Sequence, residues 1–242
     1  MLNANSPIPL YHQLKSYLQD QILQGLLKPG ERIPTEKELG ERFRISRTTV
    51  RQAIGDLINE GLLVRVHGKG TFVAQPRIQQ HLGLLTSFTQ DMEAHRRTPS
   101  SQVLQFEIQP APPPVARALQ LKIGDPVIVL KRVRLADGQP LALEVAHLPA
   151  EPFRPLLDLD MSQRSLYATL KAQFGVEPWR ALQQMEAVAC PAEEARHLQV
   201  NKGSPILHIF RTTFDQSGKP FEFVESYYRS DRFFFTMEIW SR

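Results

Sequence analysis

The stretch from Pro34 to Val73 constrains the fold most, because it reads without a gap as helix, tight turn, helix and basic hairpin: PTEKELGERFRISRTTVRQAIGDLINEGLLVRVHGKGTFV. The first helix begins at a capping box, in which Thr35 and Glu38 each accept a hydrogen bond from the other residue's amide. Soon afterwards Ser46 is suited to cap a second helix, whose apolar residues recur with the helical period. This order predicts a winged helix-turn-helix, which places its second helix in the major groove of DNA.

The second helix of this block would expose basic and hydroxyl side chains at its N-terminus. Arginine can donate two hydrogen bonds to guanine, glutamine can pair with adenine, and hydroxyls and helix-start amides can hold phosphates. The turn HGKG adds a small cationic tip that suits the minor groove or the phosphate backbone. An ordinary solvated face is the alternative for each residue taken alone. The residues that this reasoning assigns to DNA are Arg47, Thr48, Thr49, Arg51, Gln52, His67 and Lys69.

Alternating residues from Val127 onward predict a β-hairpin around a turn at Asp137 and Gly138. A three-residue loop with a left-handed glycine would place Arg132 opposite Ala142, with Arg132, Arg134 and Glu144 on one face. Two arginines at positions i and i+2 can hold an anion, and a glutamate on the next strand can accept from a hydroxyl or an amine. A surface ion-pair ladder is the alternative interpretation.

A second segment, GSPILHIFRTTFDQSGKPFEFVESYYR, echoes GDPVIVLKRVRLADGQPLALEVAHLP, with Arg211 at the position of Arg132. The echo predicts an internal repeat, two similar hairpins that face one another across a sheet and direct their arginines toward one cleft. Two predicted helix starts, at Ser87 with Thr89 and at Ser165 with Tyr167, could add amide and hydroxyl donors. Each start alone is more typical of a plain N-cap.

These motifs resemble those of a known family of bacterial transcription regulators. Residues 8–74 resemble the DNA-binding domain of the GntR family, through IPLYHQL, LKPGERIPTEKEL, ISRTTVRQAI, LINEGLL and HGKGTFV. Residues 82–241 resemble the ligand-binding domain of its HutC-like subgroup, which shares a fold with chorismate lyase, through SFTQDM, LKRVRLADGQPLALE, RSLYATL, GKPFEF and YYRSDRFFF. The resemblance covers nearly the whole chain.

The resemblance implies roles for individual residues. It adds Lys37 and Gly68 to the predicted DNA-binding set, which also includes the N-cap residue Ser46. It implies that the anionic part of a small metabolite is held by Ser87, Arg132, Arg134, Ser165 and Tyr167, and that the remainder contacts Glu144, Glu222 and Tyr228. Thr89 and Arg211 complete the predicted effector site. The sequence leaves open which hydroxyl in SFTQDM points inward, and whether Glu222 or Glu225 is the inward acid of the last hairpin.

The predicted fold class is α+β, with a winged helix-turn-helix in residues 1–75, a linker in 76–82, and an effector-binding and dimerisation domain in 83–242. The second domain is expected to be a chorismate-lyase-like antiparallel sheet with flanking helices. A chain of 242 residues with 42% hydrophobic content can bury two cores. The lone Cys190 excludes an internal disulfide and a cysteine-based zinc site. No apolar run approaches a membrane span and no signal-peptide core is present, so we expect a cytoplasmic protein without metal or cofactor.

Net charge is unevenly distributed along the chain. The total is +4, and residues 1–75 contain ten Lys and Arg against seven Asp and Glu. Attraction to phosphate is therefore local, and tight binding needs two such domains. We expect a homodimer that reads a pseudo-palindromic, double-stranded DNA operator.

The sequence as a whole predicts a ligand-responsive repressor that is released from its operator by a small anionic metabolite. The resemblance implies that a phosphorylated (amino) sugar is one such metabolite. The hinge is expected in residues 75–82. Alternative effectors are a non-phosphorylated, urocanate-like carboxylate and a fatty acyl compound, and the second domain could instead only dimerise or recruit a partner. A lyase-like enzyme is a further alternative. The residues suggest no catalytic set, so we expect no enzymatic activity.

Overall fold

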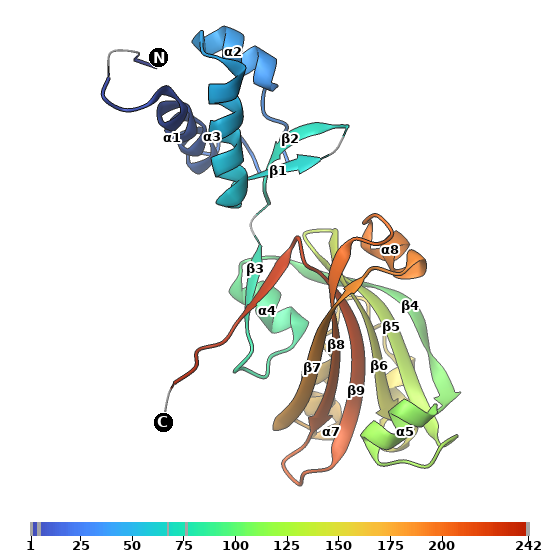
Figure 1. Cartoon of the computed structure of the whole chain (residues 1–242). Helices are drawn as coiled ribbons and strands as arrows, with labels where there is room; N and C mark the ends of the chain where they lie inside the picture. The colour runs from blue at the N-terminus through green and yellow to red at the C-terminus, as the bar shows by residue number, and fades with distance from the viewer. Residues whose placement is uncertain (1, 4–5, 67, 76, 241–242) are drawn as a thin grey trace. The chain divides into compact units, whose positions relative to one another are not determined.

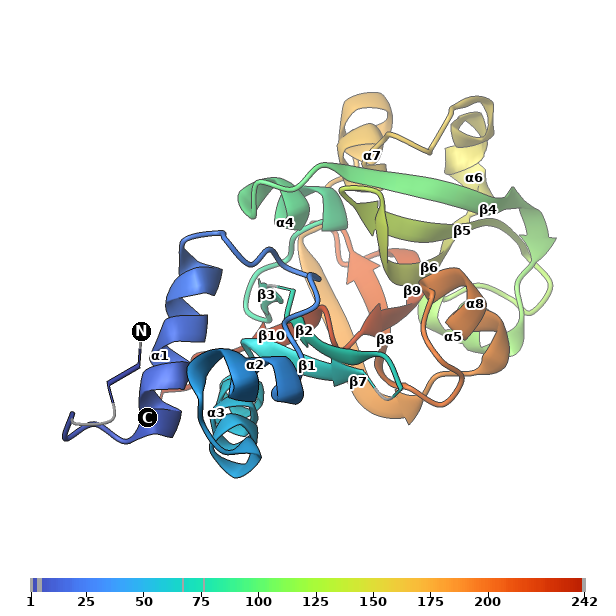
Figure 2. The ribbon, with the colours of Figure 1, turned by 90° about the horizontal axis from the view of Figure 1, so that it is seen from above.

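The computed structural model describes residues 2–3, 6–66, 68–75 and 77–240. The chain divides into two compact units, Met1–Pro76 and Arg77–Arg242. Figure 1 shows the elements of each unit along the chain, and Figure 2 shows them from above. In the part of the chain so described, no helix combines the length and apolar character needed to cross a membrane.

The N-terminal unit is a three-helix bundle with a hairpin. Its elements are α1 (Leu10–Leu23), α2 (Glu36–Phe43), α3 (Arg47–Asn59), β1 (Leu63–Val66) and β2 (Gly70–Val73). The predicted capping box forms, because the Thr35 side chain accepts from the Glu38 amide and the Glu38 side chain accepts from the Thr35 amide. The apolar faces of the three helices meet in one core, formed by Leu14, Leu18, Ile33, Leu39, Val50, Ala53, Ile54, Leu57, Leu63 and Val73. This core leaves the N-terminus of α3 exposed.

The C-terminal unit is built on a six-stranded antiparallel sheet in the order β4-β5-β6-β9-β8-β7. Its strands are β4 (Pro99–Pro110), β5 (Pro126–Ala136), β6 (Gln139–Pro149), β7 (Arg180–Ala189), β8 (Pro205–Phe214) and β9 (Pro220–Arg229). Its helices are α4 (Phe88–Ala94), α5 (Pro113–Leu119), α6 (Ala150–Phe153), the 3-10 turn η1 (Arg154–Asp158), α7 (Leu166–Phe174) and α8 (Ala192–Leu198).

The internal repeat is larger than the two hairpins. Strand β4, helix α5 and hairpin β5–β6 are followed by the same arrangement in β7, α8 and β8–β9. The two hairpins lie side by side in one sheet, with β6 and β9 hydrogen-bonded at its centre. Apolar residues of α5 and α8 pack on one face of this sheet, and those of α4 and α7 pack on the other. The fold class predicted from the sequence is therefore confirmed.

The first hairpin has a different register from the one predicted. Asp137 and Gly138 both adopt positive φ and form a two-residue turn, so Arg132 lies opposite Glu144 and not Ala142. A bulge after Arg134 shifts the pairing near Pro140, which has no backbone N–H to donate to the ladder. The error is two residues, an even number, and the predicted faces therefore survive.

The predicted linker of residues 76–82 is wrong over most of its length. Ile78–His81 forms strand β3, which pairs in parallel with β10 (Phe233–Thr236) near the C-terminus. Ile78 is buried against Met92 and Phe233 in a core shared with β9 and α4. The segment that follows the N-terminal unit is thus an integral part of the C-terminal unit.

Candidate functional site

A cavity that is partly open to solvent lies in the C-terminal unit, on the face of the sheet that carries α4 and α7. Nine of the ten predicted effector residues line it: Ser87, Arg132, Arg134, Glu144, Ser165, Tyr167, Arg211, Glu222 and Tyr228. The tenth, Thr89, lies behind this wall and accepts a hydrogen bond from Arg134 Nη2 at 3.4 Å. Seven residues outside the predicted effector set also line the cavity: Gln80, Thr86, Phe88, Leu166, Ile209, Val224 and Ser226.

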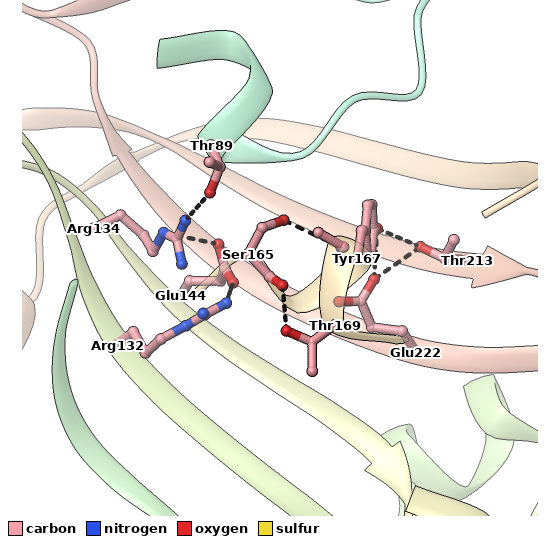
Figure 3. A network of polar contacts seen from close by, with 10 residues as sticks. Thr89, Arg132, Arg134, Glu144, Ser165, Tyr167, Thr169, Thr213 and Glu222 are labelled. Atoms are coloured by element: carbon pink, nitrogen blue, oxygen red, sulfur yellow. Dashed lines mark hydrogen bonds and ion pairs between the residues drawn. The ribbon is translucent and has the colours of Figure 1, made fainter. Parts of the chain in front are cut away.

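Two buried arginines on β5 share one carboxylate on β6, as Figure 3 shows. Arg132 Nη2 donates to Glu144 Oε1 at 2.7 Å, and Arg134 Nε lies 3.9 Å from Glu144 Oε2. The arginines are only 2% and 3% exposed. Nε and Nη1 of each arginine have no hydrogen-bond partner among the described residues. The cavity wall therefore carries more buried N–H donors than the protein's own acceptors satisfy.

The ionisation of this trio follows from its burial and its charges. Burial and the neighbouring Arg132 lower the pKa of Arg134 to about 10. Burial alone would raise the pKa of Glu144, but the two arginines outweigh that effect and hold it below its usual range. At neutral pH the trio therefore has a net positive charge, which is the sign that an anion requires.

Helix α4 adds one hydroxyl and one aromatic ring to this end of the cavity. Ser87 caps the helix by accepting from the Gln90 amide at 3.2 Å, and it lines the cavity. The guanidinium carbon of Arg134 lies 4.6 Å from the centre of the Phe88 ring, within cation–π distance. The ambiguity in SFTQDM is thus resolved in favour of Ser87 as the lining hydroxyl, with Thr89 bonded to Arg134.

The other acid in the cavity is Glu222, which belongs to a buried hydroxyl network (Figure 3). Glu222 Oε2 accepts from the Tyr167 hydroxyl at 2.7 Å and from Thr213 Oγ1 at 3.0 Å. Burial raises the pKa of Glu222, and Glu144 raises it further, against the opposing effect of the Tyr167 hydrogen bond. Glu225 does not line the cavity and contacts His208 Nε2 at 2.8 Å. The inward acid of the last hairpin is therefore Glu222.

The remaining predicted effector residues come from three elements. Ser165 caps α7 by accepting from the Ala168 amide at 3.4 Å. Arg211, on β8, donates from Nε to Gln183 Oε1 on β7 at 2.7 Å. The pKa of Tyr228, on β9, is raised by burial and by Glu144, so its hydroxyl stays protonated at neutral pH. Together these side chains line the cavity with guanidinium and hydroxyl donors and with two carboxylates, of which Glu144 lies against Arg132 and Arg134.

The N-terminal unit exposes the predicted DNA-binding residues around the start of α3. Ser46 caps this helix through the Thr49 amide at 3.1 Å, and Arg47, Thr48, Arg51 and Gln52 are exposed. Lys37 is also exposed, 3.9 Å from Glu41. Gly68, with φ of 71°, and the exposed Lys69 belong to the hairpin turn, whereas His67 lies outside the described residues.

Glu36, which was not among the predicted residues, forms ion pairs with two arginines at this surface. Glu36 Oε2 lies 3.6 Å from Arg51 Nε, and Glu36 Oε1 accepts from Arg65 Nη2 at 2.8 Å. The pair orients Arg51 at the exposed end of α3 and links it to strand β1. Elsewhere, the described residues contain no cluster of His, Cys, Asp and Glu suited to a metal ion.

Comparison with known proteins gives the same division of the chain. A family model of bacterial regulatory proteins of the gntR family matches residues 10–73, and one of the UTRA domain matches residues 94–233. The HTH-type transcriptional repressor NagR of Bacillus subtilis is 41% identical over 234 residues, which cover 97% of this chain and 96% of NagR. The Mannosyl-D-glycerate transport/metabolism system repressor MngR of Escherichia coli is 32% identical over 229 residues, 95% of each chain.

A solved structure of similar architecture supports the same assignment. The crystal structure of PhnF from Mycobacterium smegmatis has a TM-score of 0.70 and 30% identity, with 94% of this chain and 99% of PhnF covered. NagR, MngR and PhnF are named as transcriptional repressors, so the relatives support a regulator and not an enzyme. The chain belongs to the GntR family of bacterial transcription regulators, in the HutC-like subgroup that carries a UTRA effector domain.

Proposed function

We propose that this regulator is a homodimeric repressor whose DNA binding is released by a small phosphorylated amino sugar held in the cavity of the C-terminal unit. The observation that carries the proposal is the pair of buried arginines, Arg132 and Arg134. Four of their guanidinium nitrogens have no hydrogen-bond partner among the described residues. Leaving buried donors unsatisfied costs free energy, and an anion with several acceptor oxygens removes that cost.

A phosphate group fits the part of the cavity near Arg132 and Arg134. Arginine forms two parallel hydrogen bonds with phosphate, and the hydroxyls of Ser87 and Ser165 can supply further donors. The free amides at the start of α7, next to Ser165, favour negative charge as well. A carboxylate offers fewer oxygens to the same donors, so it is the weaker candidate.

The two carboxylates of the cavity, Glu144 and Glu222, favour an effector whose remaining part is polar over one with an acyl chain. Glu222 and Glu144 line the cavity with the Tyr228 hydroxyl, and carboxylates accept from hydroxyl and ammonium groups. A fatty acyl tail would cover these acids without satisfying them. Relatives are named for sugar-derived compounds, among them MngR and the Probable fructoselysine utilization operon transcriptional repressor of Escherichia coli, which is 28% identical over 229 residues.

The DNA side of the proposal rests on the exposed start of α3. In this proposal the helix enters the major groove, Arg51 and Gln52 contact bases, and the Ser46 to Thr49 region contacts phosphates. Lys37, Gly68 and Lys69 contact the phosphate backbone of the DNA. Two copies of the chain then bind the two half-sites of a pseudo-palindromic operator, because one N-terminal unit of modest charge binds DNA weakly alone.

Release follows from a difference in effector affinity between two arrangements of the dimer. The effector favours the arrangement in which the distance between the two N-terminal units no longer matches the distance between the two DNA half-sites. The size of the effect cannot exceed that difference in affinity.

The first test is fluorescence-anisotropy binding to DNA from around the protein's own gene. The ligands are glucosamine 6-phosphate, glucose 6-phosphate, inorganic phosphate, urocanate and a fatty acyl compound. We expect the amino sugar phosphate to release the DNA. Removing one charge-assisted bond in Arg132→Ala should weaken the effector by about tenfold to a hundredfold, equivalent to about 1.5–3 kcal/mol.

The matched control is Arg117→Ala, an exposed arginine of α5 outside the cavity. It should respond to the effector as the wild type does. Release by urocanate or by the acyl compound alone would replace the proposed effector class. Tight DNA binding that none of these ligands alters would instead favour a domain that only dimerises or recruits a partner.

A further inference from the structure

Gln80 is a buried polar residue on the cavity wall to which neither the sequence motifs nor the family resemblance assigns a role. It lies on β3, opposite Phe235 of β10, and is only 7% exposed. Ile78, two residues earlier on the same strand, packs in an apolar core. Because residues i and i+2 of a strand share a face, an apolar side chain would be expected at position 80. The chain instead has an amide there.

The amide of Gln80 is held in one orientation by helix α4. Its Nε2 donates to Asp91 Oδ2 at 2.7 Å, and Asp91 Oδ1 accepts from Thr86 Oγ1 at 2.6 Å. A carboxylate only accepts hydrogen bonds, so the nitrogen end of the amide faces Asp91 and the oxygen end is turned away from it. Gln80 Oε1 is buried and has no hydrogen-bond partner among the described residues.

We propose that Gln80 contacts the effector directly, with Oε1 accepting a hydrogen bond from a hydroxyl or ammonium group of the sugar. This inference rests on the proposed function. The chemistry follows from the atom that lacks a partner, since an amide oxygen needs a donor. A phosphate dianion carries no such donor, so Gln80 recognises the sugar while Arg132 and Arg134 hold the phosphate.

The same contact connects the effector to the segment that leads to the DNA-binding unit. Strand β3 begins at Ile78, directly after the N-terminal unit ends at Pro76. Helix α4 supplies Ser87 to the cavity and holds Gln80 through Asp91. A bound sugar therefore restrains β3 and α4 together. Any difference in the Gln80 contact between the two dimer arrangements contributes to the coupling between effector and DNA.

The test uses the full-length chain with Gln80→Met, which keeps the length of the side chain and removes both polar atoms. Affinity for glucosamine 6-phosphate is measured by calorimetry, and DNA affinity by anisotropy with and without this ligand. We expect a loss of about tenfold in affinity for the amino sugar phosphate, larger than any loss for inorganic phosphate, and a smaller effect of the ligand on DNA affinity.

The matched control is Gln79→Met on the same strand. Gln79 donates to Thr236 Oγ1 at 3.0 Å and does not line the cavity. This variant should keep the wild-type effector affinity and the wild-type release of DNA. Thermal melting checks that both variants fold. If Gln80→Met does not fold, Gln80→Asn tests the same contact, because its shorter side chain withdraws the oxygen from the cavity.

The outcomes separate this inference from the proposed function. If the wild type releases DNA and Gln80→Met retains its affinity and its release within about twofold, Gln80 is not an effector contact but the proposed function stands. An equal loss for inorganic phosphate and for the amino sugar phosphate also overturns the inference, because it indicates a disturbed cavity. No effect of glucosamine 6-phosphate on the wild type overturns both.

Discussion

Arg132, Arg134 and Glu144 form a buried trio in which two positive charges share one negative charge. Burying an ion pair is costly, and removing one partner leaves the other charges uncompensated. The two arginines also leave buried N–H groups without a hydrogen-bond partner among the described residues, which costs stability in the unliganded protein. We therefore expect substitutions in the trio to change folding stability as well as affinity for the proposed effector.

Glu144→Gln should destabilise the fold by about 3 kcal/mol at pH 7, because it leaves two buried arginines without a charged partner. Urea unfolding measures this difference, with the exposed Glu107→Gln as the control. The pKa of Glu144 is lower in the folded state than in the unfolded state, so its contribution is present above the unfolded pKa and is lost as the pH falls through the folded pKa. The difference between wild type and variant should shrink in acid. A pH-independent difference would contradict the assignment.

Helix α3 and its neighbour α2 form the element that we propose to present side chains to DNA. The cap at Ser46 leaves the first turn exposed, and Glu36 of α2 holds Arg51 from the side. The contact biases the Arg51 side chain only weakly, because that side chain is 71% exposed and its Nε lies 3.6 Å from the carboxylate. The exposed Glu36 pair adds little stability by itself, since surface ion pairs are weak.

Arg51→Ala should weaken DNA binding by about 1–3 kcal/mol, which is about fivefold to a hundredfold or more, if the arginine contacts a base. Effector affinity should stay at its wild-type value, because Arg51 belongs to the other compact unit. Anisotropy and calorimetry on the same preparation measure both quantities, with the exposed Arg196→Ala as the control. A parallel loss of effector binding would refute the division of labour between the units.

At the scale of the whole molecule, the residues predicted to bind DNA and the residues that line the cavity belong to different units. Of the net charge of +4, the first 75 residues carry most, since ten Lys and Arg face seven Asp and Glu there. We therefore expect DNA affinity to depend on a small number of phosphate contacts in each DNA-binding unit. Such contacts make binding sensitive to ionic strength.

The logarithm of DNA affinity should fall linearly with the logarithm of salt concentration, and Lys69→Ala should reduce that slope by about one for each head bound. Anisotropy titrations at several salt concentrations measure the slope, and Lys202→Ala, an exposed residue of the other unit, is the control. Unequal effects of Lys69→Ala on different DNA sequences would instead assign Lys69 to base recognition.

Local patterns predicted the elements well, because capping, turn and alternation signals act over a few residues. The α3 cap at Ser46 and the two hairpins are examples. Strand β3 was missed because its partner β10 lies more than 150 residues away in sequence and two of its four residues are glutamines. Long-range pairing leaves no local signal in so short a segment.

The charged residues of the candidate site were predicted from the sequence, but several of the other residues that line the cavity were not. Arg132, Arg134 and Glu144 were identifiable because alternation assigns them to one face. The choice between Glu222 and Glu225 depends on the face of β9 that meets α7, which only the packing of Tyr167 against Glu222 decides. Gln80 carried no signal, since it lay in a segment interpreted as a linker.

The pairing of β3 with β10 has a consequence for how the protein is made. Synthesis proceeds from the N-terminus, and domains generally fold as units while the chain is emerging. The DNA-binding unit is complete once Pro76 has been added, but β3 gains its partner only when Phe233–Thr236 leaves the ribosome. A nascent or prematurely terminated chain therefore contains the N-terminal unit before strands β3 and β10 can pair. The unit that contains the cavity is therefore completed after the N-terminal unit.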